Sequence, residues 1–295
     1  MAHDPITLRI GHSPDPDDAF MWYPLTERAR ATGAGAVETG PYHFVHVLED
    51  IQSLNQRAET GELEITAISI HQYPYVAGTY ALTSCGSSMG DGYGPMVVVP
   101  ENSTLRIEDL PNVRIAVPGD RTTAFLALSL LLGQSVPDFQ VVMFDQIIPQ
   151  VAAGKYDAGL IIHEGQLTYR GAGLRCVVDL GKWWTETRDL PLPLGGNAIR
   201  RDLGEPHLGR ICRILLASVR AALEHRDESV AYALQYARDM GKDLADRFVG
   251  MYVNQWTLDY GPRGREAVRQ LLREARDAGL VPDCGEVDFV EPAGR

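Results

Sequence analysis

The segments GYGPMVVVP, residues 92–100, and LPLPLGGNAIRR, residues 190–201, decide the predicted fold. Both are rich in residues that allow or impose special backbone angles and so suit a chain crossover; these are Gly92, Gly94, Pro95, Pro191, Pro193, Gly195 and Gly196. Short apolar runs alternate with helical patterns before the first segment and between the two. We therefore expect a chain that leaves a first lobe, builds a second lobe and returns.

The alternation itself predicts an α/β fold, because each apolar run has the length of a strand and most are followed by a helical pattern. The predicted strands are residues 6–12, 42–48, 63–69, 113–119, 139–144 and 156–162, and the predicted helices are residues 17–30, 49–61, 70–78, 122–133 and 145–154. Two such lobes around a central cleft result. Residues 1–97 plus 198–295 are expected to form a discontinuous lobe 1, and residues 98–197 lobe 2.

The last third of the chain is predicted to be helical. From about Asp202 the sequence is dominated by alanine, leucine, arginine and glutamate, with glycines at the ends of the patterns. The predicted helices are residues 207–225, 227–240, 243–258 and 264–279. We expect a helical C-terminal layer packed on the first sheet.

Composition limits the kind of partner. The net charge of −12 over 295 residues leaves no basic stripe for nucleic acid. A small anionic ligand remains compatible with this negative net charge, because charges beyond about 10 Å are screened at ordinary salt.

No signal peptide and no long apolar run occurs, so we expect a cytoplasmic protein without membrane insertion. The four separated cysteines predict neither a structural zinc site nor disulfides.

Two strand-to-helix connections are candidate ligand sites, because α/β proteins bind ligands where strands end. Ser69 ends one predicted strand, and its hydroxyl and neighbouring amides are expected to face the cleft. In AVPGDRTTAF the first helical amides belong to about Thr122, Thr123 and Ala124. Free N–H groups, a positive helix dipole and threonine hydroxyls suit a carboxylate. The alternative is that Thr122 is only the helix N-cap.

The loop GHSPDPDDAF, residues 11–20, opens the first helix and allows two interpretations. Ser13, Asp15 or Asp17 could cap exposed amides, with carboxylates favoured by the helix dipole. Alternatively, Asp17 or Asp18 points into the cleft and binds the hydroxyls of a substrate. A calcium loop is excluded, because the prolines disrupt the ligand spacing and no glutamate follows at the required position.

His163 and Glu164 lie directly after the predicted strand 156–162. HEGQL lacks the second histidine of a zinc-binding HExxH motif, and the chain has no GxSxG nucleophile elbow. Two interpretations of His163 remain: a core histidine whose ring nitrogens are hydrogen-bonded within the protein, or a general base in the cleft. Trp183 and Trp184 either pack in the core and against the neighbouring lobe or stack on the two faces of a flat ligand. Packing is the commoner role of adjacent tryptophans.

Seven segments identify a resemblance to a known family. In order from the first strand to about Leu280, they are SPDPDDAF, GYGPMVVV, AVPGDRTTAF, GLIIHEGQLTY, DLGKWW, LPLPLGGNAIRRDLG and YVNQWTLDYGPRGREAV. Together they closely resemble the 1,4-dihydroxy-6-naphthoate synthases of the futalosine route to menaquinone. The resemblance implies a fold like that of type II periplasmic binding proteins, with two α/β lobes around a cleft.

The resemblance also implies an activity and its residues. It implies a lyase that converts cyclic dehypoxanthine futalosine to 1,4-dihydroxy-6-naphthoate and a dihydroxyacetone-type fragment, without metal or organic cofactor. The family's catalytic histidine falls on His163. Its substrate-contacting segments fall on Ala67, Ile68, Ser69, Thr123 and Ala124.

The chain departs from the family pattern in two places. Where the family commonly has SPCPNDTF, this chain has Asp15, Asp17 and Ala19, and many members carry a lysine where Ala67 stands. One cation fewer and two carboxylates more should weaken the binding of an anionic substrate unless Arg121 or another cation compensates.

Two other functions are compatible with the sequence. One is a non-catalytic cytoplasmic protein of the same fold that binds or senses a small carboxylate. The other is the related chorismate dehydratase, which shares the fold and lacks the IIHEG segment. The sequence does not indicate an oligomeric state.

Overall fold

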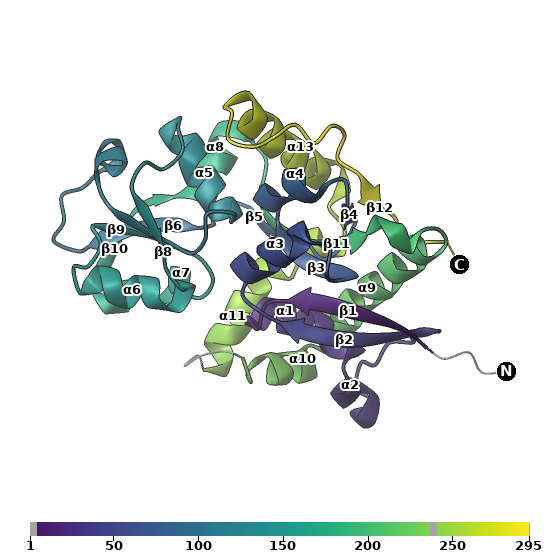
Figure 1. The fold of residues 1–295 in the computed structure, drawn as a ribbon. Coiled ribbons are helices and arrows are strands. Elements are labelled where there is room, and N and C mark those ends of the chain that lie inside the picture. The colour runs from purple at the N-terminus through teal and green to yellow at the C-terminus, as the bar shows by residue number, and fades with distance from the viewer. Residues whose placement is uncertain (1–4, 237–240, 295) are drawn as a thin grey trace.

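The computed structural model describes residues 5–236 and 241–294, which form two α/β lobes side by side (Figure 1). The first sheet has seven strands in the order β12-β4-β11-β3-β1-β2, with β5 beside β11. Its strands are β1 (Ile6–His12), β2 (Tyr42–Leu48), β3 (Ile65–Ser69), β4 (Tyr80–Thr83), β5 (Ser88–Gly90), β11 (Leu192–Arg200) and β12 (Phe289–Val290).

The second sheet has five strands in the order β10-β6-β9-β7-β8. They are β6 (Met96–Pro100), β7 (Ile115–Val117), β8 (Phe139–Val141), β9 (Ala158–Ile161) and β10 (Leu174–Asp179). The helices packed around the two sheets are α1 (Pro16–Trp22), α2 (Glu27–Thr32), α3 (Ile51–Glu59), α4 (Tyr73–Val76), α5 (Thr123–Leu132), α6 (Phe144–Ala152), α7 (Gly165–Thr168) and α8 (Leu180–Arg188).

The chain passes between the sheets twice, from β5 to β6 and from β10 through α8 to β11. This is the predicted out-and-back path. The division into residues 1–97 plus 198–295 and residues 98–197 stays a prediction, and its boundaries fall within β6 and β11.

The second crossover segment is itself a strand, which the sequence did not predict. β11 runs antiparallel to both β3 and β4, so it lies inside the first sheet. A bulge between Pro193 and Gly195 accommodates the proline. Gly195 and Gly196 therefore do not supply unusual angles. At Gly196 a Cβ atom would lie 2.2 Å from the hydroxyl of Tyr260, so close packing requires glycine there.

Several predicted elements end earlier than expected. The strand predicted at 139–144 stops at Val141, and Phe144 already begins α6. Residues 70–78 form a 3₁₀ turn, Ile70–Gln72, followed by α4. The helix predicted at 227–240 is α10, which ends at Ala233, and residues 237–240 lie outside the described part of the chain.

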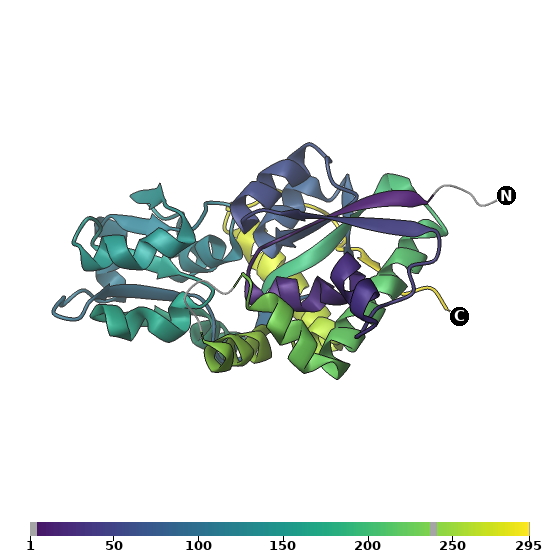
Figure 2. The same cartoon turned by 90° about the horizontal axis from the view of Figure 1, so that it is seen from below.

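The C-terminal third forms the expected helical layer. Its helices are α9 (His207–Glu224), α10 (Arg226–Ala233), α11 (Lys242–Tyr252), α12 (Gln255–Leu258) and α13 (Gly261–Asp277). Figure 2 shows these green to yellow helices gathered against the first sheet and reaching the junction with the second lobe. Ile211 and Leu215 of α9 share a buried cluster with Leu8 and Ile10 of β1. Each such side chain contributes about 1.5–3 kcal/mol when fully buried.

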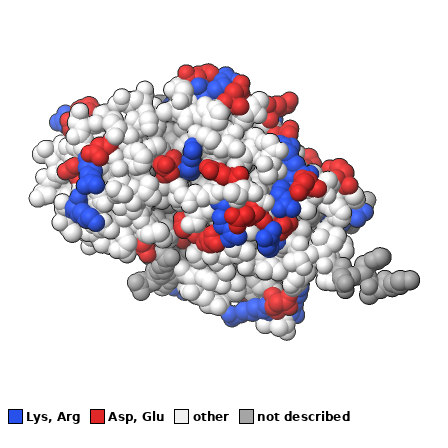
Figure 3. Space-filling view, in the orientation of Figure 1, with Lys and Arg blue, Asp and Glu red and all other residues white. Residues whose placement is uncertain are grey.

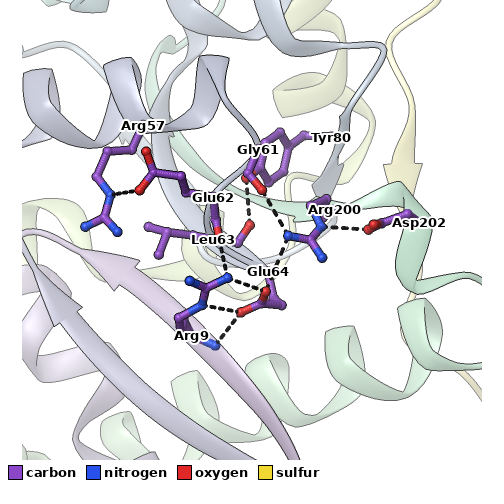
Figure 4. A network of polar contacts seen from close by, with 9 residues as sticks. All are labelled: Arg9, Arg57, Gly61, Glu62, Leu63, Glu64, Tyr80, Arg200 and Asp202. Atoms are coloured by element: carbon purple, nitrogen blue, oxygen red, sulfur yellow. Dashed lines mark hydrogen bonds and ion pairs between the residues drawn. The ribbon is translucent and has the colours of Figure 1, made fainter.

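A polar network fixes the end of β3 that lies away from Ser69 (Figure 4). Glu64 precedes β3, and its carboxylate accepts hydrogen bonds from the side chain of Arg9 on β1, at 2.7 and 2.9 Å, and from the Arg9 amide at 2.9 Å. Arg200, at the end of β11, lies 3.3 Å from the same carboxylate. Three adjacent strands are thus held together by one buried acid.

We expect Glu64→Gln to lower the free energy of unfolding at pH 7 by about 1.5–3 kcal/mol, as for other charged hydrogen bonds. Burial raises the pKa of Glu64, but the Arg9 hydrogen bonds outweigh it and leave the pKa below its usual value. The stabilisation is therefore present above about pH 4.5 and is lost as the pH falls further.

Thermal unfolding of both proteins between pH 3 and pH 7 measures this difference. Glu186→Gln is the control, because Glu186 is exposed and pairs only with exposed Lys182 at 3.7 Å. A Glu64→Gln protein as stable as the control at pH 7 would contradict the assignment.

Candidate active site

A pocket of about 780 Å³, part of it open to solvent, lies between the lobes. Its place between two lobes is a common position for a small-molecule site. The predicted site residues that line it are Ser13, Asp17, Asp18, Ala67, Ile68, Ser69, Thr123, Ala124 and His163. Glu164 does not line it. The tertiary structure thus brings four distant segments to one cavity.

Ser69 is held in place by a reciprocal pair of hydrogen bonds with Asn55 of α3. The Ser69 amide donates to the Asn55 side-chain oxygen at 2.9 Å, and the Asn55 amide group donates to the Ser69 hydroxyl at 3.0 Å. Because the hydroxyl accepts from Asn55, its own hydrogen is left to donate to a ligand. Asn55 is fully buried, so this arrangement is fixed before any ligand binds.

The start of α5 presents amides to the pocket. Thr122 is the N-cap, since its hydroxyl accepts from the Phe125 amide at 3.2 Å. The Thr123 hydroxyl is also occupied: it donates to the Leu194 carbonyl at 2.5 Å and accepts from the His71 amide at 3.2 Å. The Thr122 hydroxyl in turn donates to the Gly119 carbonyl at 2.7 Å, so both hydroxyl hydrogens are engaged within the protein, and a direct role of either in ligand binding stays a prediction. The amides of Thr123 and Ala124 have no acceptor within the helix.

The loop after β1 is organised around carboxylates. Asp15 occupies the N-cap position of α1, but its side chain makes no capping hydrogen bond, so the capping interpretation is wrong for Asp15. Its Oδ2 instead accepts the Ser13 hydroxyl. Asp18 accepts the Ser13 amide at 2.8 Å. These contacts turn Asp15 toward the second lobe and leave Asp17 at the pocket wall.

The grouped carboxyls disfavour their own ionisation. Removal from water raises the pKa of Asp17 to about 8, helped by the charges of Asp18 and Asp15. Burial raises the pKa of Asp18 to about 7, although the Ser13 amide opposes the change. At neutral pH the pocket therefore holds carboxyls that can donate a proton or a hydrogen bond.

His163 follows β9 and lines the pocket rather than the core. Its backbone adopts the left-handed region at φ 55°, which is uncommon for residues other than glycine. The imidazole Nδ1 lies 3.3 Å from Asp15 Oδ2, and the ring of Phe144 packs edge-on at 4.7 Å between centroids. A histidine in this setting, with a carboxylate at one nitrogen, has the arrangement of a general base.

Tyr252, Gln166 and Asn197 are among the pocket residues that were not predicted. Tyr252 of α11 donates a 2.8 Å hydrogen bond to Gln166 of α7, which links the lobes beside His163. Asn197 of β11 donates to the Gly86 carbonyl at 2.8 Å. Gln166 stands three residues after His163, a spacing that suggests a shared helical face. Nothing in the sequence connects Tyr252 or Asn197 to the site.

The pocket contains no compensating cation among the described residues that line it. Arg121 instead places its guanidinium 3.8 Å from the centre of the Tyr75 ring. On the face in Figure 3, basic and acidic side chains are interspersed and form no broad basic surface. Backbone amides are thus the positively polarised groups available to an anion here.

The other candidate residues lie outside the pocket. Trp184 is fully buried and Trp183 packs partly against the same core, with Arg188 stacked 4.5 Å from both rings, so the packing interpretation is confirmed.

Within the described residues, no group of three or more His, Cys, Asp or Glu is arranged to hold a metal ion. In the same part of the chain, no helix is long and apolar enough to cross a membrane.

This architecture defines a class: two α/β lobes around a ligand pocket, the fold of periplasmic binding proteins. The alkanesulfonate-binding protein of Xanthomonas axonopodis has the same fold, with a TM-score of 0.69 at 14% identity over 97% of both chains. A solved structure from Archaeoglobus fulgidus is closer, with a TM-score of 0.83 at 43% identity over 93% of this chain and 98% of that one.

Sequence comparison gives the family. A family profile described as menaquinone biosynthesis matches residues 8–277. The 1,4-dihydroxy-6-naphthoate synthase of Streptomyces coelicolor is 39% identical over 95% of this chain and 96% of its own. That of Thermus thermophilus is 40% identical over 96% and 99%. The chain belongs to the 1,4-dihydroxy-6-naphthoate synthase family of menaquinone biosynthesis, as its motifs predict.

We expect Asp17→Asn to stabilise the protein more at pH 9 than at pH 5. A carboxyl whose pKa is raised in the folded state contributes stability that is present in acid and lost as the pH rises from about 4 through 8. Asparagine does not titrate. Thermal midpoints of the variant and wild type across this range give the difference, which should grow with pH.

Asp138→Asn is the matched control, because Asp138 is exposed in the second lobe. A difference between Asp17→Asn and wild type that stays constant with pH would show that Asp17 keeps an ordinary pKa.

Proposed function

We propose that this protein is a lyase that converts cyclic dehypoxanthine futalosine to 1,4-dihydroxy-6-naphthoate, with His163 as general base. Family membership supports the role in menaquinone biosynthesis and names the product. The observation that carries the catalytic assignment is the contact between His163 and a buried carboxylate inside the pocket.

Substrate binding is assigned to both lobes. The substrate carboxylate is held by the amides of Thr123 and Ala124 at the start of α5, where the helix dipole favours an anion. Ser69 donates its free hydroxyl hydrogen from the opposite lobe, with Ala67 and Ile68 forming the adjacent wall. Asp17 and Asp18 lie where they can bind hydroxyls of the sugar-derived part.

The reaction then needs one proton transfer. Nε2 of His163 removes a proton from the sugar-derived part, and the carbon–carbon bond joining that part to the ring system breaks. The electron pair of the broken bond enters the ring system, which becomes the aromatic dihydroxynaphthoate. The imidazolium then returns the proton to the oxygen of the ring system that received the electron pair, which completes the hydroxyl of the product and restores the neutral base. General-base catalysis of this kind supplies roughly 10²–10⁴-fold in rate.

The first test is turnover of cyclic dehypoxanthine futalosine by the purified protein, with product detected by mass spectrometry. We expect wild-type turnover and a loss of roughly 10²–10⁴-fold in kcat for His163→Asn. Chorismate, tested alongside, should remain unchanged. Substrate that binds and is recovered intact from the wild type would indicate a non-catalytic carboxylate-binding protein instead.

A second test concerns binding. Ser69→Ala removes a hydroxyl that contacts the substrate in the ground state and leaves the base in place. We expect KM to rise several-fold with little change in kcat, because one neutral hydrogen bond is worth about 0.5–1.5 kcal/mol. A fall in kcat at unchanged KM would place Ser69 in the chemical step instead.

A further inference from the structure

We propose that Asp15 is a positioning residue that sets the tautomer of His163, and that it does so from the opposite lobe. This inference rests on the proposed function, since it assumes that His163 is the base. The established family relationship does not assign any role to Asp15.

The two side chains meet across the pocket. Asp15 lies in the loop after β1, in the lobe of the first sheet, whereas His163 follows β9 of the second sheet. Oδ2 of Asp15 lies 3.3 Å from Nδ1 of His163, with 6% of the aspartate side chain and 17% of the histidine side chain exposed. At such low exposure the attraction between a carboxylate and an imidazole N–H is much stronger than in water.

Asp15 is held in place independently of His163. The Ser13 hydroxyl donates to Oδ2, and the Asp15 amide donates back to that hydroxyl at 3.2 Å. Pro14 and Pro16 flank the residue and fix their own φ angles. The carboxylate is therefore presented at a fixed point of the pocket wall, ready to accept from a partner in the second lobe.

His163 is aimed at this carboxylate by its backbone and by Phe144. The left-handed backbone at φ 55° turns the side chain out of the line of β9, and the Phe144 ring packs against the imidazole. Because Nδ1 faces an acceptor, the proton is expected on Nδ1, which leaves the lone pair of Nε2 for the substrate. The described residues place no hydrogen-bond partner at Nε2, and the contact of Nδ1 with Asp15 has the distance of an ion pair, 3.3 Å.

Other acidic side chains, near in space or in the chain, can also act on the charge of the imidazole. Asp17 of α1 acts on it through space, and Asp18 stands beside Asp17. Glu164 follows His163 in the chain, and Asp145 follows Phe144 on α6. Burial raises the pKa of Asp17 and Asp18, which weakens their charge at neutral pH. Asp15 differs from them because its oxygen lies directly against Nδ1.

A carboxylate at position 15 differs from a thiol there in its chemistry and its reach. A thiol is a weaker acceptor than a carboxylate and carries a shorter side chain. When Nε2 takes a proton from substrate, the positive charge of the imidazolium faces Asp15, and no proton needs to pass to the carboxylate. The partners come from separate lobes, so the contact also joins the two lobes across the pocket.

The test is the tautomer of His163 in substrate-free protein, measured by ¹⁵N NMR of the imidazole nitrogens. His163→Asn identifies the His163 signals among the eight histidines. We expect the Nδ1–H tautomer in wild type. The informative variant is Asp15→Leu, because Asp15→Asn would keep an oxygen acceptor at the Oδ2 position, where both the Ser13 hydroxyl and Nδ1 lie. In Asp15→Leu no acceptor faces Nδ1, so the preference for the Nδ1–H tautomer should be lost. Asp138→Asn, at an exposed site, should match wild type.

Turnover of cyclic dehypoxanthine futalosine adds a second readout. We expect kcat to fall in the order wild type, Asp15→Cys, Asp15→Leu with KM nearly constant, because a thiol is a weak acceptor for Nδ1–H and leucine offers none. An unchanged tautomer in both folded variants would overturn the inference. If wild type proves inactive, the proposed function fails, but the NMR result still decides the role of Asp15.

Discussion

The pairing of β11 with β3 and β4 is the constraint on which the rest of the structure depends. After building the second lobe, the chain must return as a strand inside the first sheet, hydrogen-bonded on both sides. This places Gly195 opposite Ser69 and brings the Leu194 carbonyl to the Thr123 hydroxyl. One ladder thus sets the distance between the lobes, and the pocket lies where the lobes meet.

Polar groups beneath the pocket surface fix its shape before a ligand arrives. Asn55 holds Ser69, the amide of His71 holds the Thr123 hydroxyl, and Ser13 holds Asp15. His71 is buried and donates from Nδ1 to the Thr122 carbonyl at 3.1 Å, while burial lowers its pKa to about 4. It therefore remains neutral at pH 7 and supports the start of α5. A site built this way needs little reorganisation on binding.

The electrostatics of the pocket follow from the absence of a basic side chain among its described lining residues. An anionic group can bind only where amides point inward, at the start of α5, and the opposite wall holds carboxyls with raised pKa values. This polarity would orient a substrate with its anionic end at α5 and its hydroxyl-bearing end toward Asp17 and His163. Asp15, Asp17 and Ala67 all line this pocket.

The sequence by itself determined the two-lobe fold, the family and nine of the residues that line the pocket, because strand ends and helix starts are local signals and the motifs occur in register. It predicted Ser69, Thr123 and His163 on those grounds. Only the tertiary structure placed Asp15 against His163, Tyr252 beside Gln166, and β11 within the first sheet. The two side-chain contacts join residues more than 80 positions apart in the chain. β11 contains a proline and two glycines, which obscure the residue pattern of a strand. No spacing rule encodes them, since they arise from how the lobes pack.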